Sequence, residues 1–154
     1  MINVLFICHG NICRSPMAEF MFVDMVKKAG LTDKIHVASC ATSREAIGWD
    51  THSGTRKKLT EEGVPMYPRR AVQLRASDYE KYDYLIAMDS QNIRNIRRII
   101  KDDPEGKIFT LLQFAGSERD IADPWYTDNF DKTYEDIKEG LTAFMAFVRE
   151  KYGI

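Results

Sequence analysis

The sequence has few cysteines, almost no net charge and no long apolar run, and each absence excludes a class of protein. Its three cysteines are an odd number, which does not suggest a secreted disulfide framework. Its 22 basic and 23 acidic residues give a formal net charge of -1, which is not typical of proteins that bind nucleic acid or anionic membranes. No stretch is long enough to cross a bilayer, and the N-terminus lacks the pattern of a secretory signal. We therefore expect a cytoplasmic protein with neither nucleic acid nor a membrane as its partner.

The cysteines and histidines also lack the spacing of a metal site. Zinc ligands usually occur in tight pairs such as C-x-x-C, whereas four residues separate Cys8 from Cys13. His9, His36 and His52 do not complete a ligand set with them. We expect neither a metal nor a cofactor.

Short apolar runs alternate with helical patterns along the chain. The runs at 2–8, 35–39, 82–88 and 108–114 indicate buried strands. Helices are expected from a Ser15 cap with Pro16 at the first position to about Ala29-Gly30, around 56–62, after Asp89-Ser90, and along the periodic stripe Tyr134, Ile137, Leu141, Phe144 and Val148. This alternation predicts one domain over residues 1–154, an α/β three-layer sandwich with a central parallel four-stranded sheet and helices on both faces.

The turn after the first strand carries the strongest chemical signal. It reads Cys8-His9-Gly10-Asn11-Ile12-Cys13-Arg14-Ser15-Pro16 and leads directly into a helix N-terminus, where free N–H groups and the helix dipole bind anions. Gly10 and Asn11 tolerate the unusual dihedral angles of an anion-binding nest. Arg14 offers a planar fork for two phosphate oxygens, and the positive field favours a Cys8 thiolate. The backbone of residues 9–14 is thus predicted to bind phosphate around a Cys8 nucleophile that Ser15 assists.

Other phosphate-binding loops do not fit this turn. The sequence has no Gly-Lys-Ser/Thr of a nucleotide-hydrolase loop, and Gly10 stands alone where a dinucleotide fingerprint needs three glycines. The alternative is that Cys8 and Cys13 are small buried hydrophobes and Arg14 a surface residue. The C-x5-R-S spacing between a buried strand and a helix favours the phosphate site.

The motif from Cys8 to Pro16 resembles the signature of the low-molecular-weight protein tyrosine phosphatases. The chain length agrees, and further similar pieces are Ala38-Ser39-Cys40-Ala41-Thr42, Met88-Asp89 and Asp123-Pro124-Trp125-Tyr126. The resemblance implies hydrolysis of phosphotyrosine proteins or small aryl phosphates through a phosphocysteine on Cys8, by a monomer or weak dimer. It implies Asp123 as general acid and base, Asn11 and Ser39 as supports of the loop, and Trp125 and Tyr126 as walls of the substrate slot.

Several points stay open in the sequence. The second wall of the slot is Trp49 or Glu45, and a carboxylate there would disfavour acidic peptides. Cys13 is predicted to protect an oxidised Cys8 by forming a disulfide with it. The rival functions are an arsenate reductase, which would need cysteines beyond Cys40; a phosphoarginine phosphatase, whose members resemble this chain but carry threonine at the place of Ile12; and a non-catalytic phosphopeptide-binding module.

Overall fold

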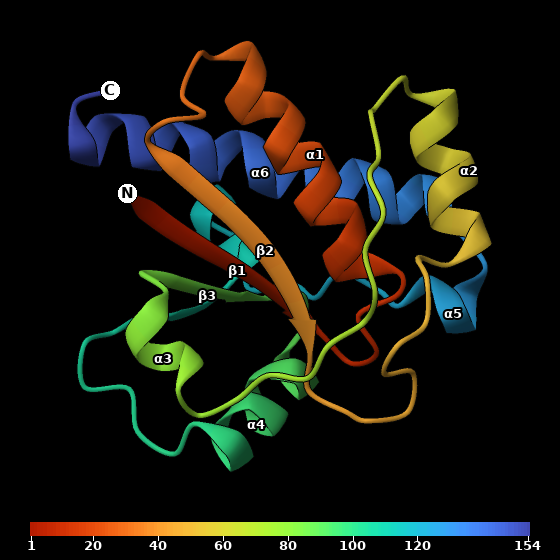
Figure 1. The fold of residues 1–154 in the computed structure, drawn as a ribbon, viewed down its shortest axis with the longest axis horizontal. Helices are drawn as coiled ribbons and strands as arrows, with labels where there is room; N and C mark the ends of the chain where they lie inside the picture. Colours follow the sequence, from red (N-terminus) through yellow and green to blue (C-terminus); the bar gives the residue numbers. More distant parts are fainter.

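The computed structural model describes residues 1–154, and its centre is a sheet of four parallel strands. The strands follow the order β2-β1-β3-β4 across the sheet (Figure 1). They are β1 (Ile2–Cys8), β2 (Ile35–Ala41), β3 (Tyr84–Ala87) and β4 (Ile108–Thr110). Because β1 lies inside the sheet, its carboxyl end, where Cys8 stands, is surrounded by the ends of its neighbours.

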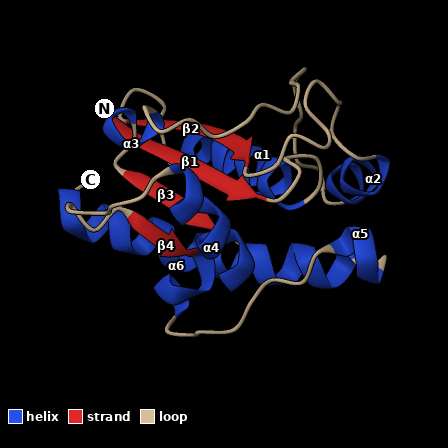
Figure 2. Cartoon of the chain, turned by 90° about the horizontal axis from the view of Figure 1, so that it is seen from below, coloured by secondary structure: helices blue, strands red, loops and turns tan.

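Helices cover both faces of the sheet and form the predicted three layers (Figure 2). One face is covered by α1 (Arg14–Lys28) and α6 (Phe130–Tyr152), and the other by α3 (Asp78–Lys81) and α4 (Ser90–Ile99). At the carboxyl end of the strands lie α2 (Ser53–Glu61) and α5 (Pro124–Thr127). A 3-10 helix, η1 (Leu111–Ala115), follows β4. None of the helices is both long and apolar enough to cross a membrane.

The alternation of side chains along β1 divides the core in two. Val4 and Phe6 belong to a cluster of 24 buried residues on the side of α1 and α6. Leu5 and Ile7 belong to a cluster of nine on the side of α3 and α4. Successive side chains of a strand point to opposite faces, so a continuous apolar run serves a sheet buried on both sides.

The predicted α/β class, the parallel sheet and the two helical layers are confirmed, but several boundaries differ, and two of the differences have a clear physical cause. The run at 108–114 is a strand only to Thr110; a capping box between Thr110 and Gln113 then turns the chain into η1. Ser15 is not the helix cap. The helix starts at Arg14 with Cys13 as N-cap, and Pro16 sits third, which is tolerated because the first helical N–H groups have no intrahelical partner anyway.

One close approach joins α6 to the sheet layer. Gly140 of α6 faces Leu111 of η1, and a Cβ at this position would stand 2.4 Å from the Leu111 Cγ. Leu111 is completely buried and closely packed, so its side chain cannot move aside to make room for a Cβ. The missing side chain at Gly140 therefore lets the long helix pack against the end of β4.

Candidate active site

The site begins with the turn of residues 9–13, which joins β1 to α1. Asn11 adopts the left-handed backbone region with φ 57°, one of only two non-glycine residues that do so. The residues after β2 hold the start of the turn, since Thr42 and Ser43 donate their backbone N–H groups to the carbonyls of Cys8 and His9. The turn is thus fixed by backbone contacts before any side chain is considered.

The Cys8 sulfur lies at the start of a buried hydrogen-bond chain. The Cys8 Sγ is 3.0 Å from the Ser15 Oγ, and the Asn11 Nδ2 donates to that Ser15 oxygen at 2.8 Å. Because the Ser15 oxygen accepts from Asn11, its hydroxyl hydrogen is free to point at the sulfur. A hydrogen bond of this kind stabilises a thiolate and helps it leave.

Asn11 is held on every polar atom of its side chain. Its Nδ2 also donates to the Ser39 Oγ at 2.9 Å, and its Oδ1 accepts from Arg69 and from the backbone N–H of Val72. Arg69 donates to the Asn11 carbonyl as well, at 2.8 Å. The strained left-handed conformation is therefore stabilised by two segments distant in sequence, Ser39 of β2 and residues 69–72.

Behind Ser39 the chain of hydrogen bonds continues to a buried carboxylate. Ser39 donates to Glu19 Oε1 at 2.5 Å, and the Tyr67 hydroxyl donates to the other oxygen of Glu19. Glu19 is 7% exposed. Burial, together with this acceptor, raises the pKa of Tyr67, so the phenol stays protonated and remains a donor.

Arg14 is almost completely buried beside the turn, at 2% exposure. Its Nη1 donates to Asp89 at 2.5 Å and to the Ile121 carbonyl at 2.9 Å, and its Nη2 lies 3.4 Å from Asp123 Oδ2. Burial alone would lower the pKa of Arg14, but the charges of Cys8, Asp123 and Asp89 outweigh it and raise that pKa. The guanidinium is therefore a fixed positive charge at the base of the site.

One atom of Arg14 has no partner. Its Nε is buried and makes no hydrogen bond, and it is one of only two buried side-chain polar atoms in the molecule of which this is true. A buried donor without an acceptor is costly, so the Nε of Arg14 is suited to donate to a bound group. An anion in the turn would supply the acceptor.

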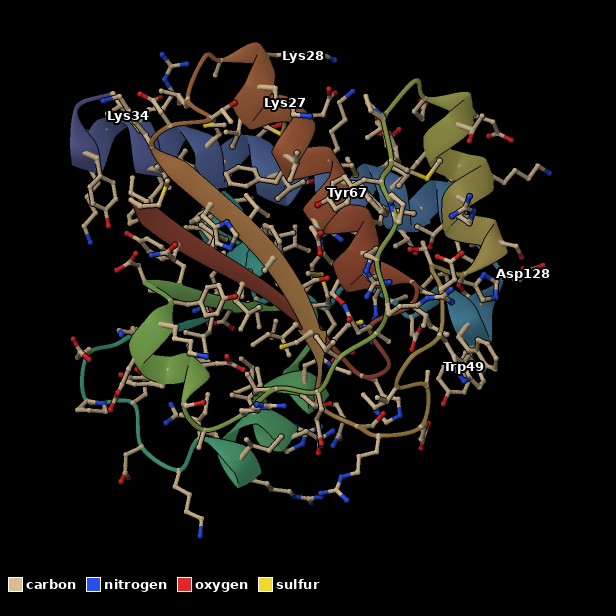
Figure 3. All side chains as sticks on the ribbon, viewed as in Figure 1. Lys27, Lys28, Lys34, Trp49, Tyr67 and Asp128 are labelled. Atoms are coloured by element: carbon tan, nitrogen blue, oxygen red, sulfur yellow. The ribbon has the colours of Figure 1, made fainter.

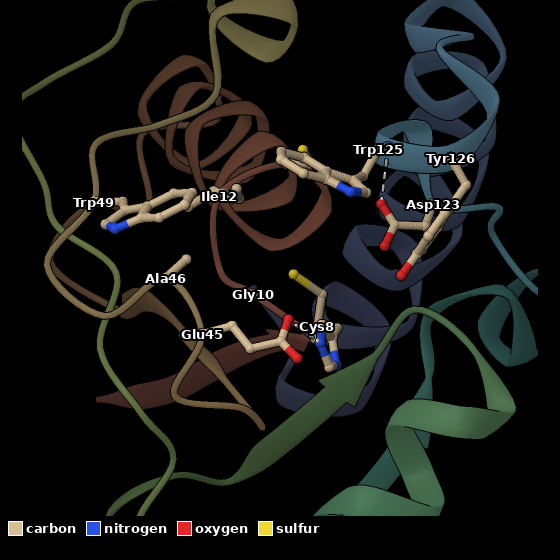
Figure 4. Close-up of a pocket in the computed structure, with 11 residues that line it drawn as sticks. Cys8, Gly10, Ile12, Glu45, Ala46, Trp49, Asp123, Trp125 and Tyr126 are labelled. Carbon is tan, nitrogen blue, oxygen red and sulfur yellow. Dashed lines mark hydrogen bonds and ion pairs between the residues drawn. The ribbon is translucent and has the colours of Figure 1, made fainter.

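A cavity of about 120 Å³ opens above Cys8 (Figure 4). Trp125 and Tyr126 of α5 lie on one side and Trp49 on the other, with the Cys8 sulfur between them. The cavity lining also includes His9, Gly10, Ile12, Cys13, Glu45, Ala46 and Asp123. The three aromatic side chains are 52–80% exposed, as expected for surfaces that await an apolar ligand rather than for core residues.

Glu45 and Trp49 both contribute to the wall that the sequence left open. The loop after β2 is held over the turn by a hydrogen bond between His9 Nε2 and Glu45 Oε2 at 2.9 Å. Trp125 in turn packs edge-on against His52, with the ring centroids 5.7 Å apart. The cavity therefore has one wall from the loop after β2 and one from α5, and a histidine contacts each wall.

Asp123 stands at the mouth of the cavity as the N-cap of α5. Its Oδ1 accepts from the Trp125 N–H at 3.1 Å, while its Oδ2 faces Arg14. Pro124 is the first residue of the helix, where its fixed φ favours the helical start. The Asp-Pro pair thus holds a carboxylate close to the turn, although Asp123 lies 115 positions after Cys8 in the sequence.

Cys13 is the last residue of the turn and is 4% exposed. Burial, with repulsion from Cys8 and Asp123, raises the pKa of the Cys13 thiol to about 12. Cys13 is therefore a neutral thiol near pH 7. No group of three or more His, Cys, Asp or Glu side chains is arranged to hold a metal ion.

The fold brings together the residues named from the sequence and adds three that the sequence did not reveal. Cys8, Ser15 and Arg14 lie around the turn, with Asp123 and the two aromatic residues beside it. The additions are Arg69 and Glu19, which support Asn11 and Ser39, and Asp89, which binds Arg14. Asp89 was expected as a helix cap, a role it has through its bond to Asn92, and as part of the Met88-Asp89 piece of the family resemblance, but its contact with Arg14 was not expected.

Comparison with known proteins agrees with this geometry. A family model described as "Low molecular weight phosphotyrosine protein phosphatase" matches residues 3–153. The low molecular weight protein-tyrosine-phosphatase YfkJ of Bacillus subtilis is 38% identical over 98% of both chains. Its crystal structure superimposes with a TM-score of 0.94 over 98% of this chain and 96% of that one. A Drosophila arginine phosphatase has a TM-score of 0.84 at 27% identity, covering 95% of this chain and 97% of its own.

The parallel sheet, with the turn at the end of its first strand, together with these relatives identifies an α/β enzyme of the phosphoric monoester hydrolase class. The chain belongs to the low molecular weight phosphotyrosine protein phosphatase family.

Proposed function

We propose that this chain hydrolyses phosphotyrosine and other aryl phosphates through a phosphocysteine intermediate on Cys8. The observation that supports this best is the buried, unpartnered Nε of Arg14 next to a cysteine that is hydrogen-bonded by Ser15. A phosphate in the turn would accept from this Nε and from the backbone N–H groups of residues 9–14. Its phosphorus would then lie in front of the Cys8 sulfur.

In the first step the Cys8 thiolate attacks phosphorus, and the bond between phosphorus and the phenolic oxygen breaks. Asp123, in its acid form, gives its proton to that oxygen, so tyrosine leaves as a neutral phenol. The guanidinium of Arg14 and the backbone N–H groups stabilise the charge on the three equatorial oxygens. Asp89 and the Ile121 carbonyl hold Arg14 in place for this role.

In the second step water attacks the phosphorus of the phosphocysteine, and Asp123 accepts a proton from that water. The bond between phosphorus and sulfur breaks, which releases inorganic phosphate and restores the thiolate. Ser15 donates a hydrogen bond to the leaving sulfur. No metal or cofactor enters either step.

The aromatic walls support an aryl substrate. A phenyl ring would lie between Trp125 and Tyr126 on one side and Trp49 on the other. Ile12, which lines the cavity and is 8% exposed, gives its floor an apolar character that suits a phenyl ring better than a guanidinium. Phosphotyrosine is therefore our primary candidate, and phosphoarginine is the alternative to test beside it.

The test compares Asp123→Asn with a matched control, Asp128→Asn. Asp128 has φ 56°, which asparagine tolerates, and asparagine at 123 keeps the cap of α5. For Asp123→Asn we expect turnover of a phosphotyrosyl peptide to fall by about 10²–10⁴-fold, and turnover of p-nitrophenyl phosphate to fall much less, because its leaving group needs little protonation. Asp128→Asn should resemble the parent chain with both substrates.

The assays should contain EDTA, and vanadate should inhibit them. Equal slowing of both substrates by Asp123→Asn would remove Asp123 as the acid. Persistent turnover in Cys8→Ser would remove Cys8 as the nucleophile. Faster turnover of phosphoarginine than of phosphotyrosine would replace the primary candidate with the alternative.

A further inference from the structure

A second depression lies on the other side of the loop after β2 from the cavity above Cys8. It measures about 690 Å³, far larger than the catalytic cavity. Its lining includes Leu5, Ala38 and Cys40, which belong to or pack against the core cluster on the side of α3 and α4. Ile47 and Val72 are also among its lining residues, and they are 43% and 52% exposed. We refer to this depression as the lateral groove.

The charges around the lateral groove are mostly positive. Arg44, Arg75 and Lys81 line it, all three are exposed, and none of them takes part in an ion pair. The one carboxylate in the lining, Asp78, accepts the Arg75 backbone N–H at 2.8 Å. Three cations without anionic partners around a partly apolar surface suit a ligand with several negative charges and an apolar side chain.

The lateral groove and the catalytic cavity share one wall. In the loop of residues 44–49, Arg44 and Ile47 line the groove, whereas Glu45, Ala46 and Trp49 line the cavity. Arg44 also donates to Gln73 at 3.2 Å, which ties this loop to the segment that borders the groove. A polypeptide whose phosphotyrosine enters the cavity therefore needs only to cross this loop to reach the groove. A spacer of roughly four to six extended residues spans about 13–20 Å.

We propose that the lateral groove binds an acidic stretch of the phosphoprotein substrate, separated from the phosphotyrosine by several neutral residues, because Glu45 in the cavity wall would repel acidic side chains next to the phosphotyrosine. The acidic side chains would pair with Arg44, Arg75 and Lys81, and an apolar side chain between them would contact the floor. A protein segment is favoured over a small free anion because only the loop of residues 44–49 separates the groove from the catalytic cavity, so one polypeptide can reach both. This inference rests on the proposed function, since it extends the substrate that the catalytic cavity binds.

The expected signature is a change in KM rather than in kcat. Contacts in the groove are made equally in the ground state and the transition state, so they strengthen binding without accelerating chemistry. A phosphotyrosyl peptide with four glutamates after a five-residue neutral spacer should show a KM about 5–10-fold lower than a peptide with four glutamines there. The advantage should shrink at about 0.5 M salt, because exposed charges are screened. Two such peptides should be compared, one with the glutamates N-terminal and one with them C-terminal to the phosphotyrosine.

Charge reversal provides the variant and its matched control. Arg75→Glu with Lys81→Glu changes only exposed side chains that make no hydrogen bond, so the fold should be preserved. Lys27→Glu with Lys34→Glu makes the same change in net charge at the end of the molecule away from Trp49 (Figure 3). We expect the first pair to abolish the advantage of the acidic peptide and the second pair to retain it.

The outcomes separate the two proposals. If no phosphotyrosyl peptide is turned over, the proposed function fails. If the glutamine peptide is turned over and the glutamate peptide is no better on either side, the function stands and the groove proposal is overturned. The groove proposal is also overturned if both variant pairs lose the advantage equally. A further control is a separate peptide that contains the spacer and the four glutamates but no phosphotyrosine. If this peptide alters turnover of p-nitrophenyl phosphate, the groove is an effector site and the proposal is overturned.

Discussion

At the scale of single residues, Asn11 connects Cys8, the proposed nucleophile, to the rest of the protein. Its side chain touches Ser15, which contacts the Cys8 sulfur, and is itself held by Ser39, Arg69 and the backbone of Val72. Every one of these contacts opposes relaxation of the left-handed backbone at position 11. The precision of the anion-binding turn therefore depends on residues that never reach the substrate.

Arg69 is the positioning residue whose removal should matter most. In Arg69→Ala the Asn11 carbonyl loses its charged partner, so the turn should loosen, and a hydrogen bond of this type contributes about 1.5–3 kcal/mol. We expect kcat/KM to fall by roughly 10–100-fold and the inhibition constant for vanadate to rise, whereas Arg70→Ala, an exposed neighbour, should change neither. An unchanged vanadate affinity in Arg69→Ala would show that the turn does not need this support.

Cys13 gives a second prediction at this scale. We propose that peroxide would oxidise the Cys8 thiolate to a sulfenic acid; attack by the Cys13 sulfur would then break the S–O bond, release water and form a disulfide that thiols reduce. Because the pKa of Cys13 is raised to about 12, its thiolate fraction and the rate of this protection should increase as the pH rises above 7. Cys13→Ala should therefore lose thiol-dependent recovery after peroxide.

Cys40→Ala is the matched control, because Cys40 is similarly buried but belongs to the core cluster on the side of α3 and α4. Full recovery of activity in Cys13→Ala would contradict the disulfide mechanism.

At the scale of elements, the contact between α6 and η1 depends on an absent side chain. Gly140→Ala places a Cβ 2.4 Å from the Leu111 Cγ, and this overpacking should lower the free energy of unfolding by about 1–3 kcal/mol despite the better helix propensity of alanine. In the background of Leu111→Ala the clash is gone. There the same change should raise the free energy of unfolding, by up to about 1 kcal/mol. Urea denaturation of the four chains measures both effects, and the same sign in both backgrounds would refute the packing argument.

The segment before β4 depends on one carboxylate. Asp103 accepts from the Tyr79 hydroxyl at 2.6 Å and from the backbone N–H groups of Lys107 and Ile108. Burial opposes ionisation of Asp103, but these hydrogen bonds and the charge of Arg97 outweigh it and lower its pKa below 3.8. A lowered folded-state pKa means that the ionised group stabilises the fold above the unfolded value and that this contribution is lost as the pH falls through the folded value.

Asp103→Asn should therefore lower the free energy of unfolding at pH 7 by about 1–3 kcal/mol. The difference from the parent chain should shrink once the pH drops below about 3.8. Asp102→Asn, at an exposed neighbouring position, should have little effect at either pH. If Asp103→Asn lowered the free energy of unfolding equally at both pH values, the charge of Asp103 would not be what stabilises the segment.

At the scale of the whole molecule, the sequence predicted what local patterns encode and missed what only the assembled chain brings together. The strands, the long amphipathic helices and the Cys8 turn follow from periodicity and from a contiguous motif. The short helix α3 was missed because four residues show no period, and the end of β4 was misjudged because an apolar run fits a strand or a helix equally well.

The supporting residues of the site show the same limit. Arg69 lies 58 residues from Asn11 in sequence, and nothing in the segment around it distinguishes it from its exposed neighbour Arg70. Asp89 carried a visible signal, its position before a helix, but that signal indicates a cap and does not identify Arg14 as its second partner. Side-chain contacts of such long range become visible only when the topology has placed the elements.

The contacts of Arg14 with Ile121 and Asp123 span 107 and 109 residues of chain. Closing chain loops of this length costs much conformational entropy. We therefore expect these two contacts to form only after the sheet and α6 are assembled. Turnover should then be the last property to return when denaturant is diluted away, later than the far-ultraviolet circular dichroism of the helices. The recovery of turnover would thus report when the last step of folding is complete.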